Sequence, residues 1–235
     1  MPRSFTYSAL TLRVKASGES NREAWFLTTE EGVIRATVFG GPKSKLRSHV
    51  APFHEGKLWI YHDPVRDTRK ASDFDVFNYR TGIRELYERS MAASAVSETI
   101  LCSDGGGGNW QEAARLAGSV LDALAAAGKD DCPEIAVYFF WHWAGILGVR
   151  PDISADISFD ISAGVSGSAG RIAHNEDFPF RLDQGTRRWL MEIQSAEAAS
   201  LQAHADPECL EQAKNFTKAI LSGALGRRLP TWDEI

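Results

Sequence analysis

The chain has 235 residues, of which 43% are hydrophobic, and a formal net charge of −5. Its three cysteines, at positions 102, 132 and 209, form no CxxC pair, which argues against a disulfide framework and a thiolate zinc site. No apolar run approaches the roughly 20 residues that span a bilayer and the first residues contain no apolar segment of signal-peptide length, so we expect a soluble, cytoplasmic protein without membrane contacts.

Residues 1–79 predict a small β-barrel. Short runs of alternating apolar residues are separated by turn sequences such as SGESN and TEEG, which is the pattern of strands with one face in a core. In the third run, Arg35 shares a face with Val33 and Thr37, so that side of the strand contacts water. Short strands so closely spaced are typical of a closed five-stranded barrel of the OB type. The predicted strands are Phe5–Val14, Trp25–Leu27, Val33–Phe39, Phe53–Tyr61 and Ala71–Tyr79.

The segment GGPKSKLRSHV, residues 40–50, is interpreted as a loop because Gly-Gly-Pro interrupts the third strand. Lys43, Lys45 and Arg47 alternate along it. Cations that follow phosphates, beside aromatic rings that stack on bases, are typical of single-stranded nucleic-acid binding by OB barrels. A solvated loop whose lysines only aid solubility remains the alternative. The aromatic residues that could take part are Trp25, Phe39 and Trp59.

Beyond residue 80 the hydrophobic period becomes that of a helix, which predicts an all-helical domain over residues 80–235 and an α+β protein. Asn109 is a candidate N-cap for a helix that ends at Ala127-Gly128, and Pro133 stands near the start of the next helix. Residues 152–183 receive no assignment. The other predicted helices are Ile83–Leu101, Pro133–Leu147, Arg187–His204 and Pro207–Leu221.

The segment EIAVYFFWHWAGILGV is apolar on nearly all sides yet too short to span a membrane. It therefore predicts the central core helix of the second domain. Surplus aromatic surface near Trp141 or Trp143 would instead form a groove for a partner's peptide, and this alternative stays open.

The patterns that carry catalysis or metal binding in other proteins are weak in this chain. Gly105–Gly108 precede a helix as phosphate-binding loops do, but without a GxxxxGK[ST] motif a flexible connector is favoured. No GxSxG or SxxK pattern indicates a nucleophile, and the histidines lack metal-ligand spacing. We therefore expect no catalytic residue, metal or cofactor. The histidine-rich positions are His49, His54, His62 with Asp63, and His142.

Charge is distributed unevenly between the two predicted domains. Residues 1–80 carry 13 Lys and Arg against 9 Asp and Glu, whereas residues 81–235 carry 13 against 22. A basic part beside an acidic part suggests that the basic part binds a polyanion.

One long stretch, ALTLRVKASGESNREAWFLTTEEGVIRATVFGGPKSKLRSHVAPF, resembles the opening of RecO, a family of bacterial recombination mediators and DNA repair proteins. It has the family's order of an apolar strand, Gly-Glu-Ser, a second strand ending in Thr-Glu-Glu-Gly, and a basic turn before Pro-Phe. Later, FFWHWAGILGVRPD resembles the family's Leu-Gly-x-x-Pro-Asp stretch. The resemblance covers the first 55 residues and one internal helix.

The resemblance implies an OB barrel, a helical domain and a protein that binds single- and double-stranded DNA and anneals strands. It implies as partners RecR and the C-terminal tail of single-stranded-DNA-binding protein, so that RecA loads onto coated strands. By matching position, the DNA contacts are expected at Arg35, Lys43, Lys45 and Arg47.

Many family members carry a four-cysteine zinc module after the Pro-Asp, but PDISADISFDISAGVSGSAG contains no cysteine. Zinc is therefore not expected, and the module's fold, if it persists in residues 152–183, must be held by apolar residues instead. The candidates for this role are Ile153, Ile157, Phe159 and Ile161.

The leading hypothesis is a non-enzymatic mediator whose barrel binds DNA and whose helical domain docks proteins. An enzyme that acts on nucleotides or phosphoesters near Gly105–Gly108, and an adaptor whose barrel binds only protein, are the alternatives. In the mediator, the acidic and apolar tail of single-stranded-DNA-binding protein needs a basic pocket beside an apolar groove. The candidate cations for it are Arg150, Arg171, Arg181, Arg187 and Arg188.

Overall fold

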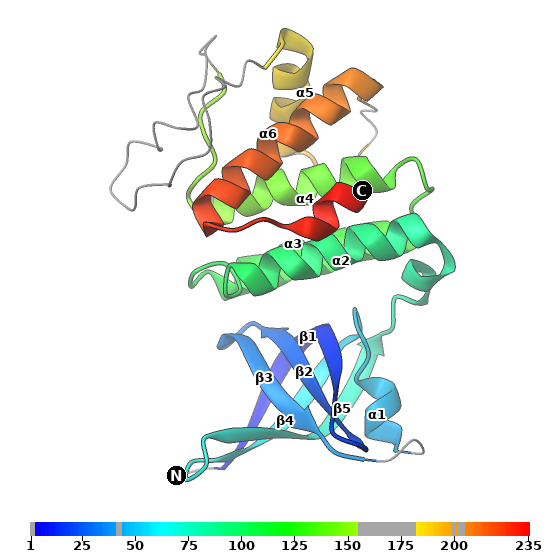
Figure 1. Ribbon diagram of the computed structural model, residues 1–235, viewed down its shortest axis with the longest axis vertical. Helices are drawn as coiled ribbons and strands as arrows, with labels where there is room; N and C mark the ends of the chain where they lie inside the picture. Colours follow the sequence, from blue (N-terminus) through cyan, green and yellow to red (C-terminus); the bar gives the residue numbers. More distant parts are fainter. Residues whose placement is uncertain (1–2, 41–43, 155–181, 199–200, 202–204) are drawn as a thin grey trace. The chain divides into compact units, whose positions relative to one another are not determined.

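Figure 1 shows a computed structural model of the chain, which describes residues 3–40, 44–154, 182–198, 201 and 205–235. The chain forms two compact units. The first combines Met1–Thr81 with Ile100–Leu121, and the second combines Gly82–Thr99 with Asp122–Ile235. In the described ranges, no helix is both long enough and apolar enough to cross a membrane.

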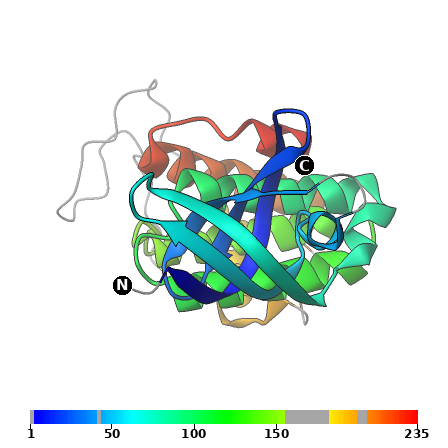
Figure 2. The same ribbon diagram turned by 90° about the horizontal axis from the view of Figure 1, so that it is seen from below.

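The first unit contains a closed five-stranded barrel (Figures 1 and 2). Its strands follow the order β1-β2-β3-β5-β4, and every pair is antiparallel except β3 with β5. This is the topology of the OB fold, so the predicted α+β class with an N-terminal OB-type barrel is confirmed. The strands are β1 (Ser4–Ser17), β2 (Asn21–Thr28), β3 (Gly32–Val38), β4 (Glu55–Asp63) and β5 (Thr68–Asn78).

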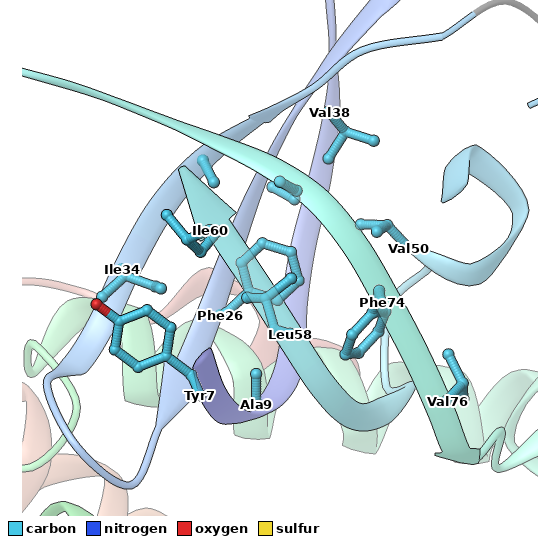
Figure 3. Packing of buried hydrophobic residues seen from close by; sticks show 13 residues of the cluster. Tyr7, Ala9, Phe26, Ile34, Val38, Val50, Leu58, Ile60, Phe74 and Val76 are labelled. Carbon is cyan, nitrogen blue, oxygen red and sulfur yellow. The ribbon is translucent and has the colours of Figure 1, made fainter. Parts of the chain in front are cut away.

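The interior of the barrel is filled by the alternate residues that the period-two pattern predicts (Figure 3). Phe26 and Phe74 meet edge to face with ring centroids 5.9 Å apart. Leu58 and Ile60 are fully buried, whereas Arg35 on β3 is exposed. The members that Figure 3 labels are Tyr7, Ala9, Phe26, Ile34, Val38, Val50, Leu58, Ile60, Phe74 and Val76.

A bulge in β1 changes which side chains face the core. The pairing of β1 with β2 shifts register between Thr11 and Arg13. Before the shift, Tyr7 and Ala9 point into the core; after it, Val14 does so. One extra residue in a strand moves every later side chain to the other face. Arg13 therefore points outward, and Lys15 does too.

The segment between β3 and β4 was predicted to be a loop. It instead contains the short helix α1 (Lys45–His49). Ser44 caps it by accepting a hydrogen bond from the Arg47 N–H. Leu46 packs against the barrel core and Val50, the C-cap residue, is fully buried. These apolar contacts fold the segment onto the barrel, which the Gly-Gly-Pro signal alone does not reveal.

A buried arginine joins α3 (Trp110–Ala126) to the barrel within the first unit. The Arg80 side chain is 1% exposed and pairs with Glu55. Its guanidinium also donates to the carbonyls of Phe53, at 3.1 Å, and Gly118, at 3.3 Å. Because Phe53 has a positive φ of 72°, the chain leaves the extended conformation there, and β4 begins at Glu55 rather than at Phe53 as predicted.

The helices confirm most of the expected pattern beyond residue 80. α3 begins directly after Asn109, and α4 carries a proline in its first turn. The predicted helix Arg187–His204 is wrong at both ends, because Asp183 caps α5 and Ala196 is already extended; residues 202–204 lie outside the described ranges. The remaining elements are η1 (Thr81–Glu85), α2 (Tyr87–Cys102), α4 (Cys132–Ile146), α5 (Gln184–Ser195), α6 (Pro207–Leu225) and η4 (Pro230–Glu234).

The core of the second unit forms around α4, as predicted. Trp232 of η4 stacks on Phe140, and its indole N–H donates to Thr99 Oγ1 at 3.2 Å. Trp141 and Trp143 are fully buried. The alternative interpretation of these two tryptophans as an exposed peptide groove is therefore wrong, because α6 and its neighbours already cover them.

A second polar network closes the barrel near the β2–β3 turn. The Tyr7 hydroxyl donates to Glu31 at 2.8 Å, and Glu31 forms an ion pair with Arg69 of β5, also at 2.8 Å. Burial, followed by the hydrogen bond to Glu31, raises the pKa of Tyr7 from 10.0 to about 12. The network links β1 and β5 to the β2–β3 turn.

Replacing the buried arginine, Arg80→Ala, should lower the free energy of unfolding by about 3 kcal/mol, because Glu55 and two carbonyls lose their donor. Arg115→Ala, which removes an exposed arginine from α3 of the same unit, should change it by less than about 0.5 kcal/mol. Urea unfolding measures both. Equal stabilities of the two variants would contradict a stabilising role for the contacts of Arg80.

The Tyr7 network predicts an alkaline loss of stability. A hydroxyl whose pKa is raised on folding stabilises the native state fully below pH 10, and this contribution disappears between pH 10 and about 12. Over that window wild type should lose about 2 kcal/mol more than Tyr7→Phe. Tyr87→Phe, which removes an exposed tyrosine, should keep the full alkaline loss. Parallel unfolding curves for wild type and Tyr7→Phe across this window would refute the effect.

Candidate nucleic-acid interface

The outer face of β1, β2 and β3 brings cations and an aromatic ring into one row. Arg13 is the register partner of Trp25, and Trp25 is in turn the register partner of Arg35. Side chains of such partners on one face of a sheet are close neighbours. The Arg35 side chain is 64% exposed, and Arg13 is also exposed. In this row, the aromatic ring of Trp25 therefore lies between two guanidinium groups on the outer surface of the barrel.

Two cations from β1 lie over the ring of Trp25. The Arg13 Cζ lies 6.0 Å from the centroid of the indole ring, and the Lys15 Nζ lies 5.8 Å from it. These are cation–π distances, and Trp is the best ring for that contact. An aromatic ring with cations close to it can stack on a base while the cations bind the adjacent phosphates.

Positive charge is concentrated on this side of the barrel. Among the described residues, β1, β2, β3, α1 and the β1–β2 turn carry six cations against two carboxylates. Glu23, one of the carboxylates, pairs with Arg35 at 3.6 Å in partial contact with water, where an ion pair is weak. The charged residues on the outer face of the three strands, hereafter the basic face, are Arg13, Lys15, Arg35 and Glu23; the other charged residues of these elements are Glu19, Arg22, Lys45 and Arg47.

A similar cation–aromatic pair on β4 has a different electrostatic environment. The Lys57 Nζ lies 5.3 Å from the centroid of the Trp59 ring. On β5, however, the register partner of Lys57 is Asp75, and that of Trp59 is Asp73. Carboxylates beside the pair repel phosphates, so Trp59 is a poorer base-stacking residue than Trp25.

The residues predicted to contact DNA lie on two elements. Arg35 is on the outer surface of β3, and Lys45 is exposed on α1. Arg47 is also on α1, but its guanidinium donates to the carbonyls of Ser20, at 3.2 Å, and Gly40, at 3.5 Å. Lys43 lies outside the described residues.

Phe39, directly after β3, is a further candidate for stacking on a base. Its ring is 45% exposed, as the sequence predicted for an aromatic stacking residue. The Lys70 Nζ of β5 lies 5.4 Å from its centroid. Lys70 is also the register partner of Thr37, which shares the outer face of β3 with Arg35.

Arg13 and Lys15 were not identified from the sequence as candidate contacts. Continued alternation from Tyr7 and Ala9 would place them on the inner face, where a charged side chain is strongly disfavoured. That conflict between charge and predicted burial was the available signal for a bulge before Arg13.

The residues considered for metal binding have structural contacts instead. In the described parts of the chain, no group of three or more His, Cys, Asp or Glu residues could hold a metal ion. His49 Nδ1 lies 2.9 Å from the Phe74 carbonyl oxygen, and His54 Nδ1 lies 2.8 Å from that of His49. Burial raises the pKa of Cys132 to about 11 and also that of Cys209, which disfavours the thiolates that bind zinc.

The glycine run serves as a tight connector on the barrel. Gly105 has a φ of 75°, and a Cβ there would lie 3.2 Å from side-chain atoms of Leu27 and Val33. The close approach to these apolar side chains explains a glycine at this position.

The second unit contains an open groove of 710 Å³ beside α5. Ile153 and Met191 supply apolar lining, and Arg187 and Arg188 supply charge. An adjoining hollow of 450 Å³ shares Ile153 and Met191 and adds Arg150. Three of the five arginines that were predicted from the sequence to bind an acidic partner thus line these two adjoining hollows. Arg171 and Arg181 lie outside the described residues.

Residues 1–75 match the family model described as Recombination protein O N terminal. No curated protein matches the chain. The match spans nearly the whole barrel, including the basic face, and agrees with the resemblance seen in the opening sequence. Residues 1–75 of the chain therefore form a domain of the RecO N-terminal family, as in recombination protein O.

Proposed function

We propose that this RecO-type recombination and repair protein binds and anneals DNA on the basic face of its barrel, without catalysing a reaction. The row of Arg13, Trp25 and Arg35 is the observation that supports this proposal. OB barrels bind oligonucleotides on the face formed by their second and third strands, and the row crosses both. Lys43, Lys45 and Arg47 would extend the site beyond β3.

The chemistry of the row suits single strands of any sequence. Stacking on an aromatic ring contributes about 1–3 kcal/mol per base and tolerates every base. Cations that neutralise phosphates add affinity that does not depend on sequence. Glu23 does not prevent this, because a phosphate can replace a carboxylate in a weak, water-exposed ion pair with Arg35. An annealing protein needs this tolerance, since it must hold strands of unrelated sequence.

The groove of the second unit suits the tail of single-stranded-DNA-binding protein, which is acidic and apolar. Guanidinium groups of Arg150, Arg187 and Arg188 would bind carboxylates of the tail. Met191 is 49% exposed, and its flexible thioether would contact the apolar side chains. We propose this groove as the docking site, with RecR as a further partner and RecA loaded indirectly.

The proposed DNA site predicts a graded response to salt. Each of Arg13→Ala, Lys15→Ala and Arg35→Ala should weaken binding of a fluorescent single-stranded oligonucleotide and flatten the log–log salt slope by about 0.7. Trp25→Ala should weaken binding by about 1–3 kcal/mol, mainly through lost stacking. Lys57→Ala and Trp59→Ala are the matched controls, because they remove a cation–aromatic pair flanked by Asp73 and Asp75.

The possible outcomes separate the three functions. Equal losses from the β4 controls and the basic-face variants would place DNA elsewhere on the protein. Wild type with no salt-dependent affinity for DNA would support an adaptor that binds only protein. Turnover of the labelled oligonucleotide with Mg²⁺ would support an enzyme, whereas annealing of complementary strands without turnover supports the mediator.

The docking groove predicts a charge-dependent loss of peptide binding. Arg187→Ala/Arg188→Ala should weaken binding of a labelled peptide, with the sequence of the single-stranded-DNA-binding protein tail, by at least about tenfold, because charge-assisted hydrogen bonds are lost. Lys129→Ala, an exposed cation elsewhere in the second unit, should leave binding unchanged. Fluorescence anisotropy measures both. An identical affinity for the double variant would exclude the groove as the docking site.

A further inference from the structure

Helix α1 cannot hold its conformation alone, because five residues are far fewer than an isolated helix needs. Its apolar side is fixed to the barrel by Leu46. His49 adds a polar contact, since its Nδ1 lies 2.9 Å from the carbonyl oxygen of Phe74 on β5. These contacts leave the side toward the β1–β2 turn to be held by other residues.

Two arginines hold that side. Arg47 Nη1 donates to the carbonyls of Ser20, in the β1–β2 turn, and Gly40, directly after β3. Arg22 Nη1, on β2, donates in return to the carbonyl of Arg47 at 3.3 Å. The two side chains thus connect α1 to the ends of three strands. We refer to Arg22 and Arg47 as the arginine bracket.

The partners of the bracket are carbonyls rather than carboxylates. No ion pair of Arg22 or Arg47 with an acidic side chain occurs among the residues that the structure describes. A phosphate that approached the Arg47 Nη1 would meet two carbonyl oxygens already bound to the same group, and their lone pairs repel an anion. Lys45, two residues earlier, is exposed to water.

We propose that Arg22 and Arg47 are positioning residues, which fix α1 against the β1–β2 turn so that Lys45 is held beside the basic face. This inference rests on the proposed DNA-binding function. It changes the expected role of Arg47, which acts through Lys45 and does not itself bind a phosphate. A cation held in place before binding loses less conformational freedom on binding, so the bracket raises affinity by preorganisation.

A double-mutant cycle in the full chain separates positioning from direct contact. Lys45→Ala should flatten the salt slope for a single-stranded oligonucleotide by about 0.7, the value of one phosphate contact. Arg47→Ala should weaken binding about fivefold and flatten the slope by no more than that value. The double variant Arg47→Ala/Lys45→Ala should have the slope of Lys45→Ala alone, because the bracket acts through that lysine.

Two further variants control the cycle. Arg22→Ala should also fail to add to the slope change of Lys45→Ala, since it removes the other half of the bracket. Arg13→Ala should add fully to Lys45→Ala, because Arg13 is held by β1 and its contact does not depend on the bracket. Additive slopes for Arg47→Ala and Lys45→Ala, with a total near 1.4, would show that Arg47 contacts a phosphate and would overturn the inference.

Hydrogen exchange without DNA provides a readout that is independent of the proposed function. The Ser48 and Val50 N–H groups donate to the Ser44 and Leu46 carbonyls within and at the end of α1. Arg47→Ala should speed exchange of both amides at least about fivefold, whereas Lys45→Ala should not. Unchanged exchange would overturn the bracket even if the DNA site stands. Wild type without DNA affinity would overturn the proposed function, whatever the exchange rates.

Discussion

Strand β1 pairs with two different strands, and both the barrel core and the basic face depend on how it does so. Its first half pairs with β4 and its second half with β2, so this one strand closes the barrel. Between the halves, the register shift at Thr11 and Arg13 reverses the direction of the side chains. Without the shift, Arg13 would enter a core occupied by Phe26 and its neighbours, where an unpaired guanidinium costs several kcal/mol. The bulge that closes the barrel therefore also exposes its cations.

Arginines serve different purposes in this barrel, and the chemistry of their partners distinguishes them. Arg80 is buried, pairs with Glu55 and donates hydrogen bonds to two carbonyls from different parts of the chain. Its role is therefore structural. Arg69 of β5 neutralises Glu31 of the β2–β3 turn, and Glu31 also accepts a hydrogen bond from the Tyr7 hydroxyl. Arg13, in contrast, is exposed and faces an aromatic ring rather than an acid. Net charge alone does not separate these roles, whereas burial and partner type do.

The strands and most helices were predictable because their signals are local. Alternation in β3 gave the correct inner residues, and the almost uniformly apolar segment of α4 gave the centre of the second unit. The site was only partly predictable. Arg35 and Phe39 follow from alternation, but Arg13 and Lys15 depend on a bulge that is set by how β1 pairs with the next strand, β2. A period-two pattern contains no information on such a partner.

Tertiary contacts explain the remaining differences. Helix α1 forms in a glycine- and proline-rich segment because the barrel core accepts Leu46, an interaction that propensity does not include. Helix α5 stops at Ser195, where the Tyr138 hydroxyl of α4 donates to the carbonyl of Ala196. In each case a residue distant in sequence decides where a helix begins or ends.

Charge and ring chemistry together argue for two separate anion sites in the proposed mediator. Such a protein must hold a DNA strand and also the acidic tail of the protein that coats it, and the two anions would compete for one site. The basic face presents Trp25 between cations, which suits bases and phosphates. The groove beside α5 presents Met191 among arginines, and none of its lining residues that the structure describes is aromatic, which suits an apolar acidic peptide. Different apolar partners would thus let each proposed site select its own anion, although both would use the same cation chemistry.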